Sequence, residues 1–384
     1  MKLLIVSMPS IHVTRWVSQL EHAGFDVYWF NVHGTDKNTK LPWVQQKVNW
    51  KLKWDYPGRT FLKKRIPILH KVLQRLFSND TAVVFESYLK DVQPDVVHSF
   101  ALYVAATPIV EVMERHTHLK WVYSSWGSDL FYFKNLPAYL KDIKRVLQRV
   151  DYLFTDCNRD YQIAKDLGFR GTFLGVFPGG GGFDFDSYNQ YIQPVTERSV
   201  ILVKGYQGRS GRAISILKAL QDVSVMLKDY HVVIFGADPD VVDYLKIYEP
   251  SYSFKVFEKS AFLPHEDIMK LMGQALLYIG NSNSDGMPNT LLEAICMGAF
   301  PIQSNPGGVT EEVITDKNNG LLIDDCESVT LIAKQIDYAF QHQKLIEQAF
   351  IYNQKTIKPE YDIDLIKNKV VEAYKSIQKR KNYD

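Results

Sequence analysis

The sequence predicts an α/β protein built from two doubly wound, Rossmann-like domains, each with a parallel sheet. Three observations support this fold class. The chain has 384 residues, about twice the length of an ordinary α/β domain. Short apolar runs alternate with longer amphipathic segments along its whole length, which is typical of repeated strand-helix-strand units. A run of four glycines, Gly179 to Gly182, interrupts this alternation near the midpoint, where a linker is expected.

The first half contains six strand-like runs, each rich in β-branched, aliphatic and aromatic residues as buried parallel strands require. In chain order they are KLLIVS (2–7), FDVYWFNV (25–32), DVVHSF (95–100), KWVYSSW (120–126), YLFTDC (152–157) and GTFLGVF (171–177). The apolar part of the first run, Leu3 to Val6, is too short for a signal peptide or a membrane span. We therefore expect a cytoplasmic protein.

The second half repeats the pattern with five runs: SVILVKG (199–205), YHVVIFGA (230–237), YSFKVFE (252–258), LLYIGNS (276–282) and AFPIQS (299–304). Helices are predicted between the runs, at 142–149, 212–220 and 289–297, and a last amphipathic helix at 361–377. The predicted organisation is an N-terminal domain at 1–178, a linker at 179–198, a second domain at 199–358, and a C-terminal helical segment at 359–384 that packs back toward the N-terminal domain.

Composition excludes several other classes. Apolar residues at 46% and charged residues at 23% are ordinary for a globular chain, which argues against disordered and fibrous proteins. The three cysteines, Cys157, Cys296 and Cys326, lie far apart without CxxC or Cys/His spacing. This pattern indicates a reducing compartment and no zinc site.

The basic residues are concentrated in one segment. Between Lys37 and Arg75 there are eleven Lys and Arg residues and one acid, so this segment carries +10 and the rest of the chain −8. Trp43, Trp50 and Trp54 are interleaved with these charges, a mixture that suits the inner face of a membrane with anionic lipids. A solvated basic segment packed by its tryptophans is the alternative. Nucleic acid is not expected as a partner, because no nucleic-acid-binding motif accompanies the charge.

One stretch of the second half, NSNSDGMPNTLLEAICMGAFPIQSNPGG (281–308), places two carboxylates, Asp285 and Glu293, eight positions apart. A buried strand is predicted just before it, and Pro288 suits the first position of a helix that Gly298 ends. In open α/β sheets ligands bind where such loops leave the carboxyl ends of the strands, because backbone N–H groups and the helix dipole favour an anion there. Two carboxylates so placed suit two parts of one extended polar ligand.

The longer string SNSDGMPNTLLEAICMGAFPIQSNPGGVTEEVI (282–314) resembles the donor-site signature of the retaining glycosyltransferases of family 4. Their GT-B fold consists of two Rossmann-like domains that face each other across a cleft. The matching residues are Asp285, Gly286, Pro288, Glu293, Gly298, Gly307, Gly308 and Glu311. PDVVHSF (94–100), WGSD (126–129), GFDV (24–27) and NNGLLI (318–323) resemble the family more weakly.

The resemblance implies a role for each residue around the signature. Glu293 would accept hydrogen bonds from the ribose hydroxyls of a nucleotide-diphosphate sugar. Asp285, where the family usually has Glu, would hold hydroxyls of the transferred hexose, with the backbone N–H groups of Gly286 and Met287 directed at sugar or phosphate. The neighbouring residues Ser282, Pro288, Asn289 and Thr290 complete the expected donor-binding set.

Two parts of the family pattern are not matched. The family often uses an Arg and a Lys in the loop after the first strand of the second domain, but in VKGYQGRSGRAIS (203–215) these positions fall on Tyr206 and near Gly211. We expect Arg209 and Arg212 to replace them, or Lys204, since glycines around the two arginines let the backbone approach phosphate.

The second departure is in the N-terminal domain, where Trp126 replaces the histidine of the family's HGxD motif, and Trp cannot act as an acid or a base. The polar residues at the carboxyl ends of the predicted strands are then the candidates. We expect Asp129 and His98 to act beside Asp285 as catalytic residues. Asp129 could equally cap a loop, and His98 and His12 could each have a structural role instead. The acceptor-side candidates are Ser10, His12, Trp126 and Ser128.

The expected reaction is transfer of a hexose from a nucleotide sugar to a hydroxyl of a glycan, lipid-linked or other acceptor, without metal or other cofactor. The leaving diphosphate itself would take the acceptor's proton on the same face of the sugar. A GT-A enzyme with a DxD metal motif and a dinucleotide oxidoreductase are disfavoured, because DxD recurs three times without context and the loop after the first strand has no glycine. A nucleotide-sugar epimerase on the same fold and a catalytically silent scaffold subunit remain as alternatives.

Overall fold

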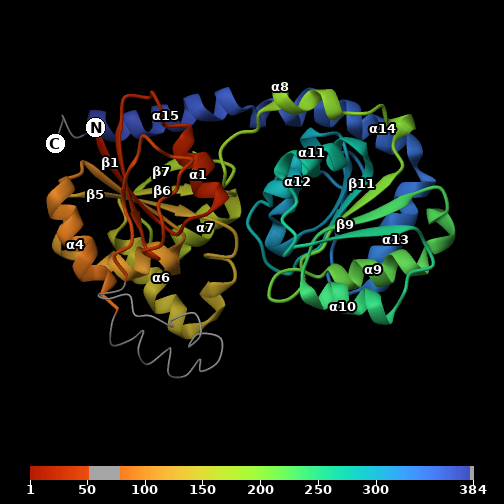
Figure 1. Ribbon diagram of the computed structural model, residues 1–384, viewed down its shortest axis with the longest axis horizontal. Helices are drawn as coiled ribbons and strands as arrows, with labels where there is room; N and C mark the ends of the chain where they lie inside the picture. The colour runs from red at the N-terminus through yellow and green to blue at the C-terminus, as the bar shows by residue number, and fades with distance from the viewer. Residues whose placement is uncertain (52–77, 381–384) are drawn as a thin grey trace. The chain divides into compact units, whose positions relative to one another are not determined.

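The computed structural model describes residues 1–51 and 78–380, and the chain forms two compact units (Figure 1). The first unit consists of Met1–Asp156, Asp160–Gly181 and Lys369–Asp384, and the second of Cys157–Arg159 and Gly182–Asn368. Residues 182–198, assigned to the linker from the sequence, are thus grouped with the second unit. None of the helices in the described ranges is both long and apolar enough to span a bilayer.

The first unit contains a parallel sheet of seven strands in the order β3-β2-β1-β4-β5-β6-β7. The strands are β1 (Lys2–Ser7), β2 (Asp26–Asn31), β3 (Gln45–Lys47), β4 (Val96–Phe100), β5 (Lys120–Ser125), β6 (Tyr152–Thr155) and β7 (Thr172–Val176). Because β1 lies inside the sheet and the strands are added outward on both sides, this is the Rossmann order. Helices cover both of its faces (Figure 1): α1 (Ile11–Ser18), α4 (Thr81–Val92), α5 (Val110–Arg115), α6 (Pro137–Arg149) and α7 (Asn158–Asp166).

The second unit repeats this topology with six parallel strands in the order β10-β9-β8-β11-β12-β13. They are β8 (Val200–Lys204), β9 (His231–Ala237), β10 (Phe254–Glu258), β11 (Ala275–Gly280), β12 (Phe300–Ser304) and β13 (Leu321–Ile323). The helices are α8 (Phe185–Tyr188), α9 (Ala213–Asp222), α10 (Pro239–Ile247), α11 (His265–Gln274), α12 (Asn289–Cys296), α13 (Val329–Gln341) and α14 (Gln343–Tyr352), followed by α15 (Ile363–Arg380).

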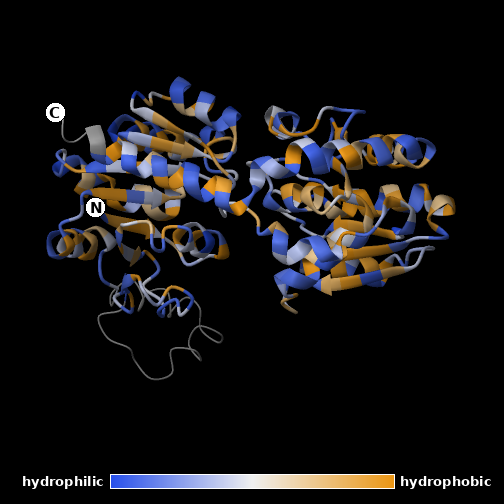
Figure 2. Cartoon of the chain, turned by 90° about the horizontal axis from the view of Figure 1, so that it is seen from above, coloured by the Kyte–Doolittle hydropathy of each residue, from blue (hydrophilic) through white to orange (hydrophobic). Residues whose placement is uncertain are grey.

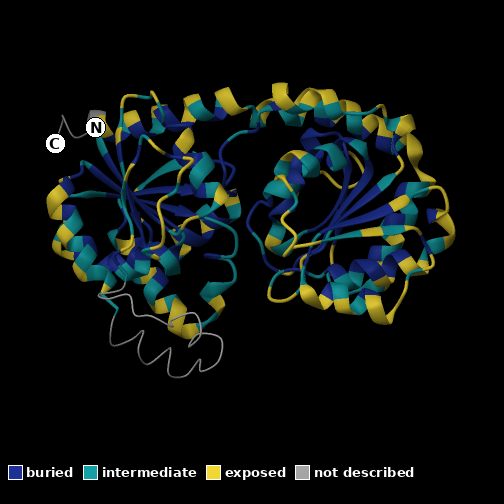
Figure 3. Cartoon of the chain, in the orientation of Figure 1, coloured by how far each residue is buried: buried dark blue, intermediate teal, exposed yellow. Residues whose placement is uncertain are grey.

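The predicted doubly wound α/β fold is confirmed, and each of the eleven predicted strand runs coincides with a strand. The central strands are dark blue in Figure 3 because their side chains are buried between the helical layers, whose outer faces are exposed. The edge strands β3, β7 and β10 are less buried. The helices alternate between apolar and polar residues in Figure 2, as expected when one face packs on the sheet. Two strands were missed, β3 and β13, because each has three residues and is too short to show a period.

The C-terminal helix contributes to the core of the first unit. Residues of α15 from Lys369 onward belong to that unit, and Tyr374 is fully buried there. Its hydroxyl accepts a hydrogen bond from Trp16 Nε1 at 3.0 Å and lies 2.6 Å from His98 Nδ1. The sheet of the first unit therefore depends on a residue far along the chain.

The basic segment 37–75 lies only partly within the described residues, since 52–77 fall outside them. Trp50 agrees with the alternative in which tryptophans of this segment pack inside the protein. Its side chain is buried, its Nε1 donates to the Asn31 carbonyl at 2.8 Å, and its ring stacks on Phe30 with centroids 5.0 Å apart. Trp50 is therefore part of the core and is not available to a membrane interface, whereas Trp43 is half-buried.

Candidate functional site

In the second unit, β8 and β11 are adjacent, and the strand order reverses between them. The loops that leave the carboxyl ends of these two strands are 205–212 and 281–288, and ligands of doubly wound sheets bind at this switch point. The first loop begins at Gly205. Glycine is required at this position because a Cβ atom would lie only 2.7 Å from Ala237 Cα. The structure thus brings the basic loop and the acidic signature to one edge of the sheet, which agrees with the expectation from the family resemblance.

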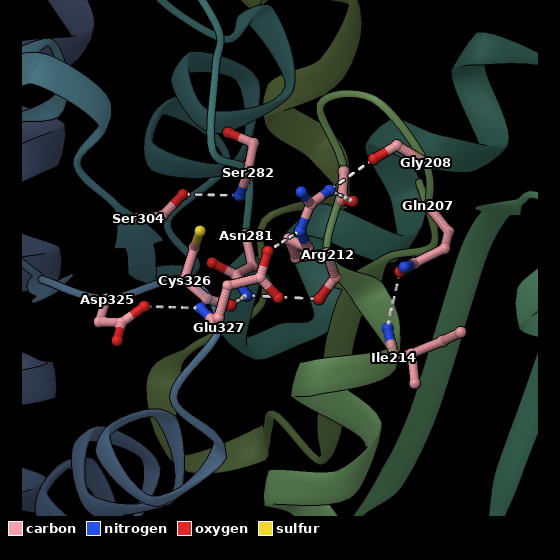
Figure 4. Close-up of polar contacts among 11 residues, drawn as sticks. Gln207, Gly208, Arg212, Ile214, Asn281, Ser282, Ser304, Asp325, Cys326 and Glu327 are labelled. Carbon is pink, nitrogen blue, oxygen red and sulfur yellow. Dashed lines mark hydrogen bonds and ion pairs between the residues drawn. The ribbon is translucent and has the colours of Figure 1, made fainter.

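The two loops are joined by backbone hydrogen bonds. Arg212 N donates to the Asn281 carbonyl at 2.9 Å, and Asn283 N donates to the Ser210 carbonyl at 3.0 Å. The side chain of Asn281 connects these two loops to a third, the segment after β13, because its Nδ2 donates to the carbonyl of Cys326 at 2.7 Å. Figure 4 shows these segments converging, with Ser282 N bonded to Ser304 Oγ on the neighbouring strand at 2.7 Å.

Arg212 is directed into this framework. Its Nε forms an ion pair with Glu327, and its Nη1 donates to the carbonyls of Gly208 and, at 2.8 Å, Gly211 (Figure 4). The guanidinium therefore ties its own loop to the segment after β13. Arg209, its neighbour in the sequence, has an exposed side chain. Of the two arginines predicted to bind phosphate, Arg212 thus holds the loops together, and Arg209 is the more exposed one.

Lys204, the last residue of β8, lies beside the first signature acid. Its Nζ is 3.7 Å from Asp285 Oδ2 and 4.8 Å from the centroid of the Tyr206 ring. Burial by itself lowers the pKa of Lys204, but the negative charge of Asp285, together with Tyr278 and Tyr206, outweighs burial and raises it above the ordinary value. The ammonium group is consequently charged at neutral pH. Lys259 approaches the Tyr206 ring as well, at 4.5 Å, and pairs with Asp238 at 2.9 Å.

Asp285 and Glu293 occupy different surroundings. Asp285 lies in the loop, has a side chain 26% exposed, and accepts a hydrogen bond from Gly286 N at 3.0 Å. Glu293 lies within α12, has a side chain only 4% exposed, and its Oε1 is 2.7 Å from Nε2 of His265. His265 begins α11 and was missed in the sequence analysis, since nothing in the spacing of HEDIMKLM indicates a partner 28 positions away.

The remaining signature residues shape the loop and the start of α12. Met287 is buried, and Thr290 Oγ1 accepts a hydrogen bond from the buried Tyr278 hydroxyl at 3.0 Å. Pro288 stands at the cap, one position before the first helical residue, Asn289, and therefore not at the predicted first helical position. Within the described residues, Ser282 Oγ and Asn281 Oδ1 are buried and have no hydrogen-bond partner.

The second part of the signature is a turn after β12. Gly307 and Gly308 have φ of 64° and 80°, in the left-handed region that favours glycine. The turn folds back so that Asn305 Nδ2 donates to Glu311 Oε1 at 2.7 Å. Gly298 ends α12 with φ of 82°, and a side chain there would meet Phe350 at 2.4 Å. The three signature glycines therefore stand where the backbone has positive φ.

His98 in the first unit does not have the catalytic environment that the sequence suggested. Its side chain is completely buried, Nδ1 is 2.6 Å from the Tyr374 hydroxyl, and Nε2 is 2.8 Å from Ser124 Oγ. Burial lowers the pKa of His98 well below its ordinary value. Both ring nitrogens are engaged inside the core, so the residue holds α15 to the sheet.

Asp129 also has a structural position rather than the expected catalytic one. Its Oδ2 accepts hydrogen bonds from Leu102 N at 2.6 Å and from the Tyr123 hydroxyl at 2.9 Å. These bonds support the turn at Ala101, a non-glycine residue with φ of 67°. Burial raises the pKa of Asp129 to about 7, and the two hydrogen bonds only partly oppose this.

The acceptor-side candidates gather at the carboxyl ends of β1 and β5. Ser10 caps α1, accepting from Val13 N at 3.1 Å. The His12 and Trp126 rings contact each other edge to face, with centroids 6.2 Å apart, and both side chains are partly exposed. Ser128 is also partly exposed. His12, Trp126 and Ser128 therefore remain accessible, whereas His98 and Asp129 are withdrawn into the core.

Two family models match the chain, one in each half. Residues 3–157 match the model "Glycosyl transferase 4-like", and residues 190–356 match "Glycosyl transferases group 1". The two models together cover most of the chain, which is therefore a glycosyltransferase of the GT-B type. No curated protein sequence matches it.

Solved structures with the same fold align with almost the whole length of this glycosyltransferase. Sucrose-phosphate synthase from Thermosynechococcus elongatus is 14% identical, with a TM-score of 0.71 and 99% of each chain covered. A glycosyltransferase from Rickettsia africae is 14% identical, with a TM-score of 0.69 and 98% of each chain covered. HepE from Anabaena, solved in complex with UDP and glucose, is 14% identical, with a TM-score of 0.64 and coverage of 98% of this chain and 99% of that one. At these identities the likeness shows the fold.

Proposed function

We propose that this glycosyltransferase is a retaining enzyme of family 4 that transfers a hexose from a nucleotide-diphosphate sugar to a hydroxyl of a glycan or lipid-linked acceptor, at the cytoplasmic face of the membrane. The observation that carries the proposal is the arrangement at the β8/β11 switch point. There Lys204 lies against Asp285, and Glu293 follows in the helix that starts beside them. The complexes of HepE with UDP-glucose and with UDP and glucose make a nucleotide sugar the first donor class to test.

The proposed roles follow from charge and position. Glu293 binds the ribose hydroxyls, because a carboxylate accepts from two adjacent O–H groups. Asp285 binds hydroxyls of the sugar, and its partly exposed position in the loop gives it access to them. Lys204, held charged by Asp285, stabilises the negative charge that develops on the diphosphate as it leaves. The amide groups at the start of α12 favour the same anion.

The proposed reaction needs no protein nucleophile. The bond between the anomeric carbon and the diphosphate oxygen breaks, and a bond to the acceptor oxygen forms on the same face. The acceptor's proton passes to the departing diphosphate, which is the base nearest to it. No metal ion is required by this route, and activity should persist in EDTA.

The test is a thermal-shift screen of UDP, GDP, ADP, CMP and their sugars on the wild type, Glu293→Ala and, as a control at an exposed glutamate of α14, Glu347→Ala. A diphosphate present at 100 times its Kd adds about 2.7 kcal/mol to stability, which is a shift of several degrees. We expect one nucleoside diphosphate to stabilise the wild type and Glu347→Ala but not Glu293→Ala. If no nucleotide stabilises the wild type, the transferase proposal fails and a silent scaffold subunit replaces it.

Product analysis separates transfer from the other activities of this fold. With the donor identified in the screen, sugar release or transfer is followed by NMR, which also reports whether the anomeric configuration is kept. Inversion would refute the retaining mechanism. Conversion of the donor to an epimeric sugar without any acceptor would instead establish an epimerase.

Membrane contact through the basic segment 37–75 remains a proposal that rests on its +10 charge and on Trp43. Its most basic part, including Lys63, Lys64 and Arg65, lies outside the described residues. Changing these three residues to Glu should weaken binding to vesicles that contain anionic lipid, because each basic residue near the surface contributes about 1 kcal/mol. Unchanged vesicle binding would remove the membrane from the proposal.

A further inference from the structure

The buried carboxylate of Glu293 has a specific partner, His265. The Nε2 to Oε1 distance is 2.7 Å, and the two side chains are 27% and 4% exposed, respectively. A carboxylate buried to this degree needs a hydrogen-bond donor, because its charge is costly to remove from water otherwise. His265 supplies that donor from the first residue of α11, an element that the glycosyltransferase signature does not include.

A second contact orients the histidine ring. The Tyr188 hydroxyl lies 3.4 Å from His265 Nδ1, and the two rings meet edge to face with centroids 5.7 Å apart. The neutral tautomer with hydrogen on Nε2 satisfies both contacts, since Nε2–H then donates to Glu293 and Nδ1 accepts from Tyr188. Tyr188, His265 and Glu293 come from α8, α11 and α12, so three helices of the second unit fix one carboxylate.

We propose that His265 is the positioning residue of Glu293 and thereby sets the affinity of the enzyme for the ribose of its nucleotide. This inference rests on the proposed function, in which Glu293 binds the ribose hydroxyls. A carboxylate held in one rotamer by an imidazole meets two vicinal hydroxyls without first losing conformational freedom. His265 itself does not need to touch the ligand, so its effect passes through Glu293 and concerns only the ribose hydroxyls.

The experiment is isothermal calorimetry with pairs of ligands that differ only in those hydroxyls. UDP and 2′,3′-dideoxy-UDP are the first pair, with the GDP and ADP pairs run in parallel. The proteins are the wild type, Glu293→Ala, His265→Ala, His265→Gln and Tyr188→Phe. Gln at 265 carries a side-chain N–H that can replace Nε2–H, whereas Ala cannot. Tyr188→Phe keeps the aromatic ring and removes only the long hydrogen bond.

We expect His265→Ala to weaken binding of the ribonucleotide about tenfold, the value of one hydrogen bond to a charged group. The dideoxy ligand should bind His265→Ala and the wild type equally well. His265→Gln should recover most of the lost affinity, and Tyr188→Phe should change it less than threefold. The double variant lacking both His265 and Glu293 should bind like Glu293→Ala alone, because the histidine acts through the carboxylate.

The outcomes distinguish this inference from the function beneath it. If no nucleoside diphosphate binds the wild type, the proposed function and the inference fail together. If the ribonucleotide binds and Glu293→Ala weakens it, but His265→Ala does not, only the role of His265 is refuted. If His265→Ala weakens the ribonucleotide and the dideoxy ligand to the same extent, the histidine is merely structural, and that result also overturns the inference.

Discussion

Arg198 gives the sharpest prediction on stability, because it is an arginine buried in the second unit. Only 4% of the residue is exposed. Its three guanidinium nitrogens donate to the carbonyls of Gln193 at 2.9 Å, Ala275 at 2.9 Å and Met297 at 3.2 Å. Burial lowers its pKa to about 10. The residue therefore joins the segment before β8, the start of β11 and the end of the signature helix α12.

The change to test is Arg198→Met, which keeps much of the side-chain volume and removes all three donors. Each carbonyl left buried without its donor costs about 1–3 kcal/mol, while the desolvation cost of the guanidinium is no longer incurred. The net loss for three carbonyls is about 3–5 kcal/mol. With a urea slope of about 2 kcal/mol per molar, the unfolding midpoint of the second unit should fall by roughly 2 M.

The positions of the tryptophans make the assay specific. None of the seven tryptophans falls within the residue ranges of the second unit, whereas far-ultraviolet circular dichroism reports on both units. We expect Arg198→Met to produce an early circular-dichroism transition without a matching change in tryptophan fluorescence. Arg209→Met, at an exposed arginine of the same unit, should change stability by less than about 0.5 kcal/mol. A loss below 1 kcal/mol in Arg198→Met would refute the reasoning from the three carbonyls.

Three further predictions concern other buried groups. Because the pKa of Asp129 is raised to about 7, the folded state holds a proton that the unfolded state releases above its own pKa near 4. The free energy of unfolding should therefore fall by a few kcal/mol as pH rises from about 4 to 7. Urea unfolding of the wild type and of Asp129→Asn at several pH values measures this dependence, because the variant lacks the titrating group. An equal dependence on pH in both proteins would contradict the prediction. Tyr374→Phe should cost about 2–4 kcal/mol, seen by tryptophan fluorescence, because Trp16 Nε1 and His98 Nδ1 lose their partner; a midpoint equal to the wild type would show that the hydroxyl is dispensable. Gly298→Ala should cost about 1–3 kcal/mol in circular-dichroism melting, because of its positive φ and the contact with Phe350, and a neutral result would mean that the turn can rearrange.

Much of the fold was predictable because it depends on local pattern. Eleven strands coincide with apolar runs whose length and composition are visible in the sequence, and parallel pairing follows from the helices between them. The acidic signature and the basic loop came together because carboxyl ends of neighbouring strands share one edge of a sheet. The glycines at 298, 307 and 308 mark backbone conformations that other residues rarely adopt.

The rest depends on contacts between distant residues. His98 and Asp129 have the sequence features of accessible strand-end residues, but the partner of His98 is Tyr374, 276 positions away, and Asp129 accepts from Leu102. Arg212 is one of two arginines in a glycine-rich loop, and only the structure shows its ion pair with Glu327, 115 positions away. The contact between His265 and Glu293 depends in the same way on how two helices pack.

The contribution of α15 to the first unit has a consequence for biosynthesis. The buried hydroxyl that bonds to Trp16 and His98 belongs to Tyr374, which is synthesised long after the sheet that it contacts. Until then, the N-terminal sheet has a buried imidazole and an indole N–H without their partner, and a nascent chain stalled before residue 374 should be open to proteolysis in its N-terminal part. Synthesis of the α15 residues from Lys369 onward, rather than of the first 181 residues, sets the moment at which this unit becomes fully stable.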